Sequence, residues 1–272
     1  MLDQTLDDGT DTPDNTLADL AWAIACDFDG TISLQDTTDA VLAQFATPEW
    51  LTIEAQFESG AISSGQCMRD QVALIQASAE QLEIFLRNLE LDPDFIRFVE
   101  LARFYKLPIQ VMSDGLDHNV KLSLERLGLN LPFAANALEP NGRNGWRMRS
   151  PFANAACRVN AGTCKCQLMT KMAKQAAQEG DNFSQIAPAL QPRRVLLIGD
   201  GRSDFCAATQ ADFVFAKSKL ARHCQLHGIA HAEIHSFSDA VRLLPALLKG
   251  DLFVSEPNRA DTSLISSNYS KV

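Results

Sequence analysis

Three largely apolar runs stand far apart in this sequence, and each ends abruptly at a polar residue or a glycine. They cover residues 21–26, 107–112 and 194–198. Such runs are typical of strands that are buried on both faces of a parallel sheet. Segments with helical spacing alternate with them, so we predict an α/β fold with a doubly wound parallel sheet. In such folds ligands bind beyond the carboxyl ends of the strands.

The first run leads into two aspartates, Asp27 and Asp29, followed by Gly30 and Thr31. We expect the chain to turn directly after this pair, at the carboxyl end of the strand. Gly30 permits that turn. Two carboxylates at a strand end can hold a hard cation such as Mg²⁺, and one can attack phosphorus to form an aspartyl-phosphate. The alternative is an ordinary aspartate turn at the surface.

Two later segments offer groups that bind phosphate. Ser113 follows the second run and precedes Asp114 and Gly115. A hydroxyl and free backbone N–H groups at a strand-to-helix junction form a phosphate cradle, although Ser113 and Asp114 could also simply cap a helix. Lys165 begins a helical stretch that runs to about residue 177. Its charge can neutralise phosphoryl oxygens, and the alternative is a solvated lysine.

The third run ends in Gly199 and Asp200, and Asp204 follows four residues later. We expect Ser203 to cap the helix that begins there. Asp204 then lies in its first turn, close enough to Asp200 to share an ion or its water shell. The alternative is a turn and a helix cap without a ligand. The four groups of residues come in an order that would bring all of them to one edge of one sheet, which chance does not readily produce.

These four motifs resemble those of haloacid dehalogenase (HAD) superfamily phosphatases over about residues 24–216. Within the phosphoserine-phosphatase-like branch (subfamily IB), the chain resembles the MtnX-like family of 2-hydroxy-3-keto-5-methylthiopentenyl-1-phosphate phosphatases. This closer likeness rests on residues 45–50, 162–166 and 216–220, with Cys224 and His231. Residues 113–117 read Ser-Asp-Gly-Leu-Asp where that family has Ser-Gly-Gly-Met-Asp, and residues 180–193 read as an insertion.

The resemblance implies a Mg²⁺-dependent phosphatase in which Asp27 is the nucleophile. It implies that Asp29 protonates the leaving alkoxide and then deprotonates the attacking water. Mg²⁺ would be held by Asp27, the backbone carbonyl of Asp29 and Asp200, with Asp204 nearby. The transferring oxygens would be bound by Ser113, the backbone around Asp114 and Gly115, and Lys165.

Residues 36–106 read as helical throughout, in segments 39–45, 48–57, 64–75, 80–89 and 95–104. A capping-box pattern at 78–81 begins one of them. In the superfamily this insertion is a type-1 cap, a small helical lid over the core site. Asp36, Thr37 and Thr38 stand at its start, where they either face the substrate or, for Asp36 or Thr37, cap the first helix. Trp50 either lines the pocket or packs a cap helix.

The remaining residues 21–35 and 107–254 are predicted to form the core. A helix is expected at 116–127, and a hairpin at 133–138 and 146–149 with a turn at 141–145. Another strand–helix–strand unit covers 194–198, 205–210 and 213–215, and a closing helix covers 238–248. Residues 1–20 and 255–272 are expected to be flexible tails.

Charge and composition limit the partners. The net charge of −10 argues against binding nucleic acid, but not against a small phosphorylated metabolite. No stretch reaches transmembrane length, and the acidic start of the chain is not a secretory signal, so we expect a cytoplasmic monomer or homodimer that does not bind membranes. The seven cysteines are then expected to be reduced. Cys157, Cys164 and Cys166 either bind zinc, which needs a fourth ligand, or are unliganded thiols.

Other functions remain open from the residues alone. The substrate could be the enolase-phosphate of methionine salvage, phosphoserine or another small phosphorylated metabolite. A dehalogenase is disfavoured because Asp29 suits protonation of a phosphate ester. A non-catalytic phosphate-binding protein is disfavoured because Asp27, Asp29 and Lys165 are all present.

Overall fold

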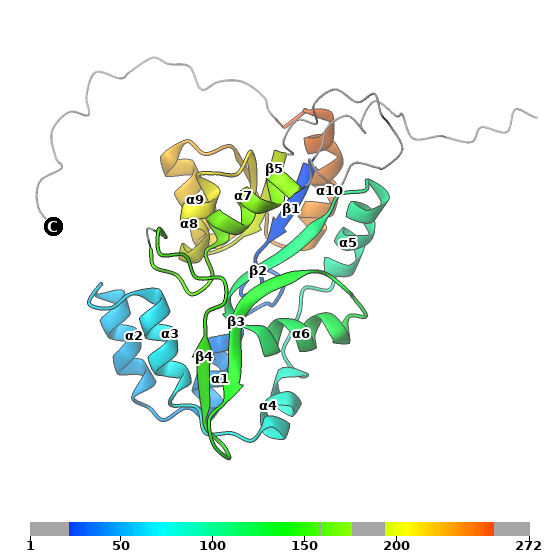
Figure 1. The fold of residues 1–272 in the computed structure, drawn as a ribbon. Helices are drawn as coiled ribbons and strands as arrows, with labels where there is room; N and C mark the ends of the chain where they lie inside the picture. The colour runs from blue at the N-terminus through cyan, green and yellow to red at the C-terminus, as the bar shows by residue number, and fades with distance from the viewer. Residues whose placement is uncertain (1–21, 158, 176–193, 253–272) are drawn as a thin grey trace, which may run out of the picture.

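The computed structural model describes residues 22–157, 159–175 and 194–252. Its centre is a seven-stranded sheet in the order β4-β3-β2-β1-β5-β6-β7, parallel except for β4 (Figure 1). The strands are β1 Trp22–Cys26, β2 Ile109–Leu116, β3 Phe133–Pro140, β4 Trp146–Arg149, β5 Arg194–Gly199, β6 Phe213–Ala216 and β7 His231–Glu233. The predicted doubly wound α/β fold is confirmed, as are the hairpin and its turn, where Asn141 N donates to Gly145 O at 2.8 Å.

The register of the central strands determines where the site lies. β1 lies between β2 and β5, and Cys26 at its end pairs with Val111 and Ile198. The segments that follow these three positions therefore leave the sheet at the same edge. This edge brings together the first, second and fourth motifs, which are far apart in the sequence.

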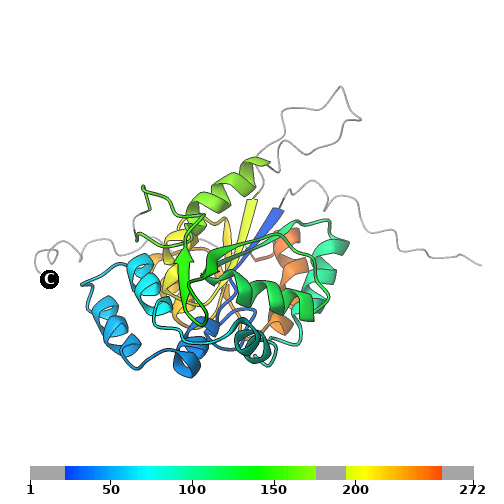
Figure 2. The ribbon, with the colours of Figure 1, turned by 60° about the horizontal axis from the view of Figure 1, so that its bottom comes forward.

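Helices cover both faces of the sheet (Figures 1 and 2). On one face lie α5 Phe95–Phe104, α6 Asp117–Arg126 and α10 Phe237–Lys249. On the other lie α7 Lys165–Gln175, α8 Phe205–Ala208 and α9 Ser218–His227. β1 alternates accordingly, because Trp22 and Ile24 join the first core while Ala23 and Ala25 join the second. The small alanines let α7, which carries Lys165 at its first position, pack close to β1.

Four helices between β1 and α5 form a third apolar cluster with the hairpin. They are α1 Thr37–Phe45, α2 Trp50–Glu58, α3 Ser64–Val72 and α4 Ala79–Leu86. Buried Leu42 and Leu82 from these helices pack with Trp146, whose Nε1 donates to Ala77 O at 2.8 Å. Trp50 is partly buried against this cluster, which supports its packing interpretation. The predicted capping box of Ser78 and Gln81 is present at the start of α4.

The fifth helix of the expected cap lies elsewhere. α5 packs in the main core through fully buried Phe95 and Phe98, and the ring of Phe95 lies 4.9 Å from that of Phe237 on α10. α5 therefore packs against the sheet through its apolar face, although the sequence analysis placed it in the cap. The division of the chain into a core and a cap that ends at residue 106 stays a prediction.

Two elements were missed by the sequence analysis, and several predicted segments lie outside the described residues. The sequence analysis did not identify β7, which extends the sheet beyond β6, or α9, which connects these two strands. Ala21, the end of the α7 segment at residues 176–177, the insertion at 180–193 and both expected tails lie outside the described residues.

Candidate active site

Asp27 is the first residue beyond β1 and is buried. Its backbone N–H donates to Ile198 O at 2.8 Å, which continues the pairing with β5 by one residue. Its Oδ1 accepts from Phe28 N at 2.7 Å. The chain then turns through Gly30, whose φ of +70° favours glycine. A Cβ at Gly30 would lie 2.5 Å from Asp200 Oδ2, so glycine is also required for the close approach of the fourth motif.

Lys165 connects Asp27 with Asp204. Its Nζ lies 2.7 Å from Asp27 Oδ1 and 2.6 Å from Asp204 Oδ1, and it also donates to Ser203 Oγ at 3.1 Å. Lys165 is 3% exposed, which makes the alternative of a solvated lysine wrong. Ser203 is part of the 3₁₀ turn Arg202–Asp204 and does not cap α8 as expected, since Asp204 is the N-cap residue of α8 and makes no side-chain cap.

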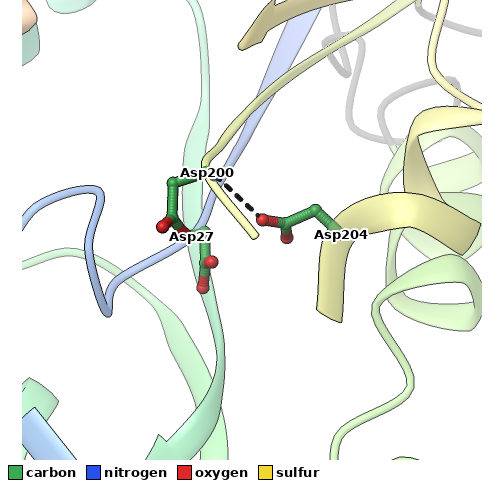
Figure 3. A group of neighbouring side chains, drawn as sticks. All are labelled: Asp27, Asp200 and Asp204. Atoms are coloured by element: carbon green, nitrogen blue, oxygen red, sulfur yellow. Dashed lines mark hydrogen bonds between the residues drawn. The ribbon is translucent and has the colours of Figure 1, made fainter. Parts of the chain in front are cut away.

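Asp200 and Asp204 lie next to Asp27. One carboxylate oxygen from each of the three lies within 4.8 Å of the others, and no other group of three or more potential ligands in the described ranges is as close (Figure 3). Asp204 Oδ2 accepts from the backbone N–H groups of Asp200 and Gly201 at 3.1 and 3.3 Å. Three acidic oxygens at these separations could hold a metal ion. The role expected for the Asp29 carbonyl stays a prediction.

The carboxylate of Asp29 points to a different set of partners. Its Oδ1 accepts from Thr37 N at 2.8 Å and from Thr37 Oγ1 at 2.6 Å, while its Oδ2 accepts from Ser113 Oγ at 3.0 Å. Asn119 Nδ2 in turn donates to Thr37 Oγ1 at 2.8 Å. The carboxyl of Asp29 is therefore held by the first residue of α1 and by the second motif.

The second motif is tightly packed around Ser113. Its buried Oγ accepts from Gly115 N at 2.8 Å while it donates to Asp29. A Cβ at Gly115 would collide with the Asp29 carboxylate and lie 3.0 Å from Thr38 Oγ1, so no other residue fits without rearrangement. The phosphate-binding roles of Ser113, Asp114 and Gly115 stay predictions.

Asp114 joins three separate segments. Its Oδ1 accepts from Thr163 N at 2.9 Å, its Oδ2 accepts from Ser64 Oγ at 3.0 Å, and its backbone oxygen accepts from Asn136 Nδ2 at 2.6 Å. The partners come from the loop before Lys165, from α3 and from β3. Asp114 therefore links the second motif to the approach of Lys165 and to the helices above the site.

Burial controls the acid–base properties of the site. It raises the pKa of Asp29 to about 6, against the hydrogen bonds from Thr37 and Ser113. Burial and the neighbouring Asp204 also raise the pKa of Asp200 to about 6. The pKa of Asp27 is raised by burial and by Asp204, with Lys165 opposing them. Burial would lower the pKa of Lys165, but the Asp204 and Asp27 carboxylates outweigh it and raise the pKa.

Asp36 is an exposed residue that caps α1. Its Oδ1 accepts from Asp39 N at 2.9 Å. This contact supports the helix-cap interpretation, and the role of Asp36 in binding substrate stays a prediction. Thr37 is buried against Asp29, and Thr38 is buried beside Gly115.

Two buried side chains that the sequence analysis did not assign support the site. Asn119, on α6, orients Thr37 from a position 82 residues away. Lys217 follows β6, and its Nζ donates to Thr31 O at 3.0 Å, which anchors the loop after Asp29. The residue types alone carry no signal for these contacts, although 216–220 belongs to the segments that resemble the family.

Among the described residues, the cysteines do not form the zinc site that was one of the two alternatives for them. Cys157, Cys164 and Cys166 are free thiols and do not make a group of close ligands among the described residues. They line one pocket of about 260 Å³ together with Cys206. Zinc therefore has no support from this geometry.

Comparison with known proteins identifies the family. The family described as "Putative Phosphatase" matches residues 22–249. The chain belongs to this family. The 2-hydroxy-3-keto-5-methylthiopentenyl-1-phosphate phosphatase of Geobacillus kaustophilus is 29% identical over 222 residues, which are 80% of this chain and 93% of that protein. The enzyme of the same name from Exiguobacterium sibiricum is 28% identical over 222 residues, 80% of this chain and 94% of that protein.

Solved structures agree with the fold of this phosphatase. A substrate-bound phosphoserine phosphatase has a TM-score of 0.58 at 19% identity, covering 82% of this chain and 97% of the other. A phospho-aspartyl intermediate analogue of phosphoserine phosphatase has a TM-score of 0.57 at 20% identity, with the same coverage. The expected place in the phosphoserine-phosphatase-like branch, close to the MtnX-like family, is confirmed. No helix in the described part of this phosphatase has the length and apolar character needed to cross a membrane.

Proposed function

We propose that this phosphatase is a Mg²⁺-dependent phosphomonoesterase that works through an aspartyl-phosphate on Asp27. The observation that carries the proposal is the contact of Asp27 with Lys165, beside the carboxylates of Asp200 and Asp204. A carboxylate at the end of a central strand, next to a buried cation, suits attack on a phosphoryl group whose charge is being neutralised.

The charges of this group fit a divalent cation. Asp27, Asp200 and Asp204 carry three negative charges when ionised, against the single positive charge of Lys165, which leaves an excess of two. Carboxylate oxygens are the ligands that Mg²⁺ prefers. These three residues would hold the ion, together with the Asp29 carbonyl expected from the sequence. When bound, Mg²⁺ would supply positive charge to the transferring oxygens.

The remaining steps are assigned to residues of the chain. Asp27 attacks phosphorus, with its Oδ1 held by Phe28 N and Lys165. Asp29 gives a proton to the leaving oxygen and then takes one from the water that cleaves the aspartyl-phosphate, as microscopic reversibility requires. A pKa of about 6 lets Asp29 perform both transfers near neutral pH. Ser113, the backbone near Gly115 and Lys165 bind the phosphoryl oxygens.

The names of the relatives support a particular substrate. We propose that it is 2-hydroxy-3-keto-5-methylthiopentenyl-1-phosphate, on which the Geobacillus and Exiguobacterium relatives are named as acting. Phosphoserine is the substrate class to test against it. The segment α1 to α4 contributes none of the residues assigned to the chemistry except Thr37 beside Asp29, and it is where we expect selection of the substrate to occur.

The test is phosphate release from a panel of small phosphorylated metabolites that includes both candidates. We expect the highest kcat/KM for 2-hydroxy-3-keto-5-methylthiopentenyl-1-phosphate. Excess EDTA should abolish phosphate release, and added Mg²⁺ should restore it. Full activity in EDTA would contradict the metal assignment. A higher kcat/KM for phosphoserine would overturn the substrate assignment and leave the reaction class intact.

A further inference from the structure

Two cysteines lie in contact between the third and fourth motifs. Cys166 Sγ donates a hydrogen bond to Cys206 Sγ at 2.9 Å. Cys166 directly follows Lys165 on α7, and Cys206 lies two residues after Asp204 on α8. The pair therefore joins the two elements whose side chains meet in the 2.6 Å contact of Lys165 with Asp204.

The pair is open to small molecules. Both sulfurs line the pocket of about 260 Å³ and belong to partly exposed residues. Cys157 and Cys164 line the same pocket, so four thiols surround a space large enough for a peroxide molecule. None of them has a role in the proposed hydrolysis.

We propose that Cys166 and Cys206 are a peroxide-sensitive pair whose disulfide turns the phosphatase off. Peroxide oxidises one thiol to a sulfenic acid, as an S–O bond forms, the O–O bond breaks and water leaves. The second sulfur then forms the S–S bond and displaces the sulfenic oxygen, which leaves as a second water with the remaining thiol proton. Two thiols are thus oxidised while one peroxide is reduced to two waters, and a dithiol reverses the change.

The geometry explains how the disulfide would act on the site. An S–S bond is about 2.05 Å long, so the two sulfurs must approach by just under 1 Å. That shift is transmitted to the adjacent Lys165 and to the turn that holds Asp204. Misplacement of a catalytic group by about 1 Å can cost about a hundred-fold in rate, so we expect at least a ten-fold loss of kcat. The effect on turnover rests on the proposed function, whereas the disulfide itself does not.

The chain is well suited to a direct test by mass spectrometry. Lys165 separates Cys164 from Cys166, and Arg158 and Arg202 also lie between the four cysteines, so trypsin places each on its own peptide. The reduced full-length protein is treated with a small molar excess of hydrogen peroxide, its remaining thiols are alkylated, and it is digested without reductant. We expect a linked pair of peptides containing Cys166 and Cys206, lighter by two hydrogens than the sum of the reduced peptides.

Turnover of p-nitrophenyl phosphate with Mg²⁺ is followed in parallel, since this ester does not depend on the natural substrate. Peroxide should lower kcat by about ten-fold or more and dithiothreitol should restore it, which oxidised methionines would not allow. Cys206→Ser should be active, form no link and resist peroxide. Cys157→Ser, a change in the same pocket, should behave like the unaltered protein.

Several results would overturn the proposal. They are alkylation of both Cys166 and Cys206 after peroxide, a link between Cys157 and Cys164 instead, zinc bound to these cysteines in the isolated protein, or a Cys166–Cys206 link with unchanged kcat. If the reduced protein released no phosphate at all, the proposed function would fail while the peptide link would still report on the pair.

Discussion

At the scale of single residues, the chemistry depends on carboxylates with different surroundings. Asp27 contacts a lysine, Asp29 accepts from the neutral donors of Thr37 and Ser113, and Asp204 accepts from the backbone N–H of Asp200. The same residue type can therefore serve as nucleophile, acid–base group and ligand, because each carboxylate meets a different local environment.

The nucleophile can be tested with a nearly isosteric change. Asp27→Asn keeps the acceptor for Phe28 N, so the protein should fold, but an amide cannot form the acyl-phosphate. We expect turnover of p-nitrophenyl phosphate to fall at least about a thousand-fold, with an unchanged circular dichroism spectrum. Asp212→Asn is the same change at the residue before β6, whose carboxylate accepts from Val195 N near the start of β5, and it should retain activity. Residual turnover near the normal rate in Asp27→Asn would remove this residue from the mechanism.

Single residues also mark the limit of what the sequence can predict. Asp27, Asp200, Asp204 and Lys165 were expected to meet because each follows a strand or begins a helix in a recognisable motif, and the structure brings them together. Asn119 belongs to no such motif. It acts on the site through one hydrogen bond to Thr37, a contact that exists only in the folded chain. Ser203 was misassigned because its hydroxyl faces Lys165 and not a free backbone N–H.

At the scale of elements, α1 couples the helical segment to the chemistry. Its cap residue Asp36 holds the first turn, and the next residue, Thr37, makes two hydrogen bonds to Asp29. Any loosening of this turn should therefore affect every substrate alike.

Substitution of the cap residue tests that coupling. Asp36→Ala should lower the free energy of unfolding by about 1 kcal/mol, measured by urea denaturation, while Asp36→Ser should largely preserve it. We expect the alanine variant to lose the same fraction of kcat on p-nitrophenyl phosphate as on the metabolites. A changed order of preferred substrates would instead make Asp36 a contact to the substrate.

Element boundaries were predictable where the pattern is local. The bounds of α5 match the expectation of 95–104, because its apolar residues recur at helical spacing. Its place in the main core was not predictable, since the sequence shows an apolar face but not which partner covers it. The fold class was predictable because it follows from the alternation of strands and helices along the chain, which does not require knowing which helix covers which face of the sheet.

At the scale of the whole molecule, the site lowers stability above about pH 6 when no cation is bound. Asp29 and Asp200 have a pKa of about 6 in the folded protein, against about 3.9 in an unfolded chain. Between these pH values the folded state binds more protons than the unfolded chain. The contribution of the two carboxyl groups to the free energy of unfolding is therefore fully present below about pH 4 and is lost as pH rises through 6. The cytoplasmic location and the monomeric or homodimeric state stay predictions.

The melting temperature of the metal-free protein should report this linkage. We expect it to be higher at pH 5.5 than at pH 7.5 by about 3 °C, both values lying above the sequence pI of about 4.9. Asp200→Asn and Asp29→Asn should each reduce the dependence of the melting temperature on pH. This distinguishes titration of the site from charge repulsion over the whole protein. Mg²⁺ at pH 7.5 should raise the melting temperature of the unaltered protein and not that of Asp200→Asn. A pH-independent melting temperature would contradict the raised pKa values.

The place of β1 between β2 and β5 also has a consequence for how the protein forms. Residue 22 pairs with residue 194, so the centre of the sheet closes only when two distant parts of the chain meet. Contacts of such high sequence separation slow folding, because the entropy of a long loop is lost before the contact is gained. During synthesis Asp27 is made early, but its backbone N–H can donate to Ile198 O only after β5 has been synthesised. We therefore expect nascent chains that stop before residue 194 to expose the apolar β1 and to depend on chaperones for their solubility.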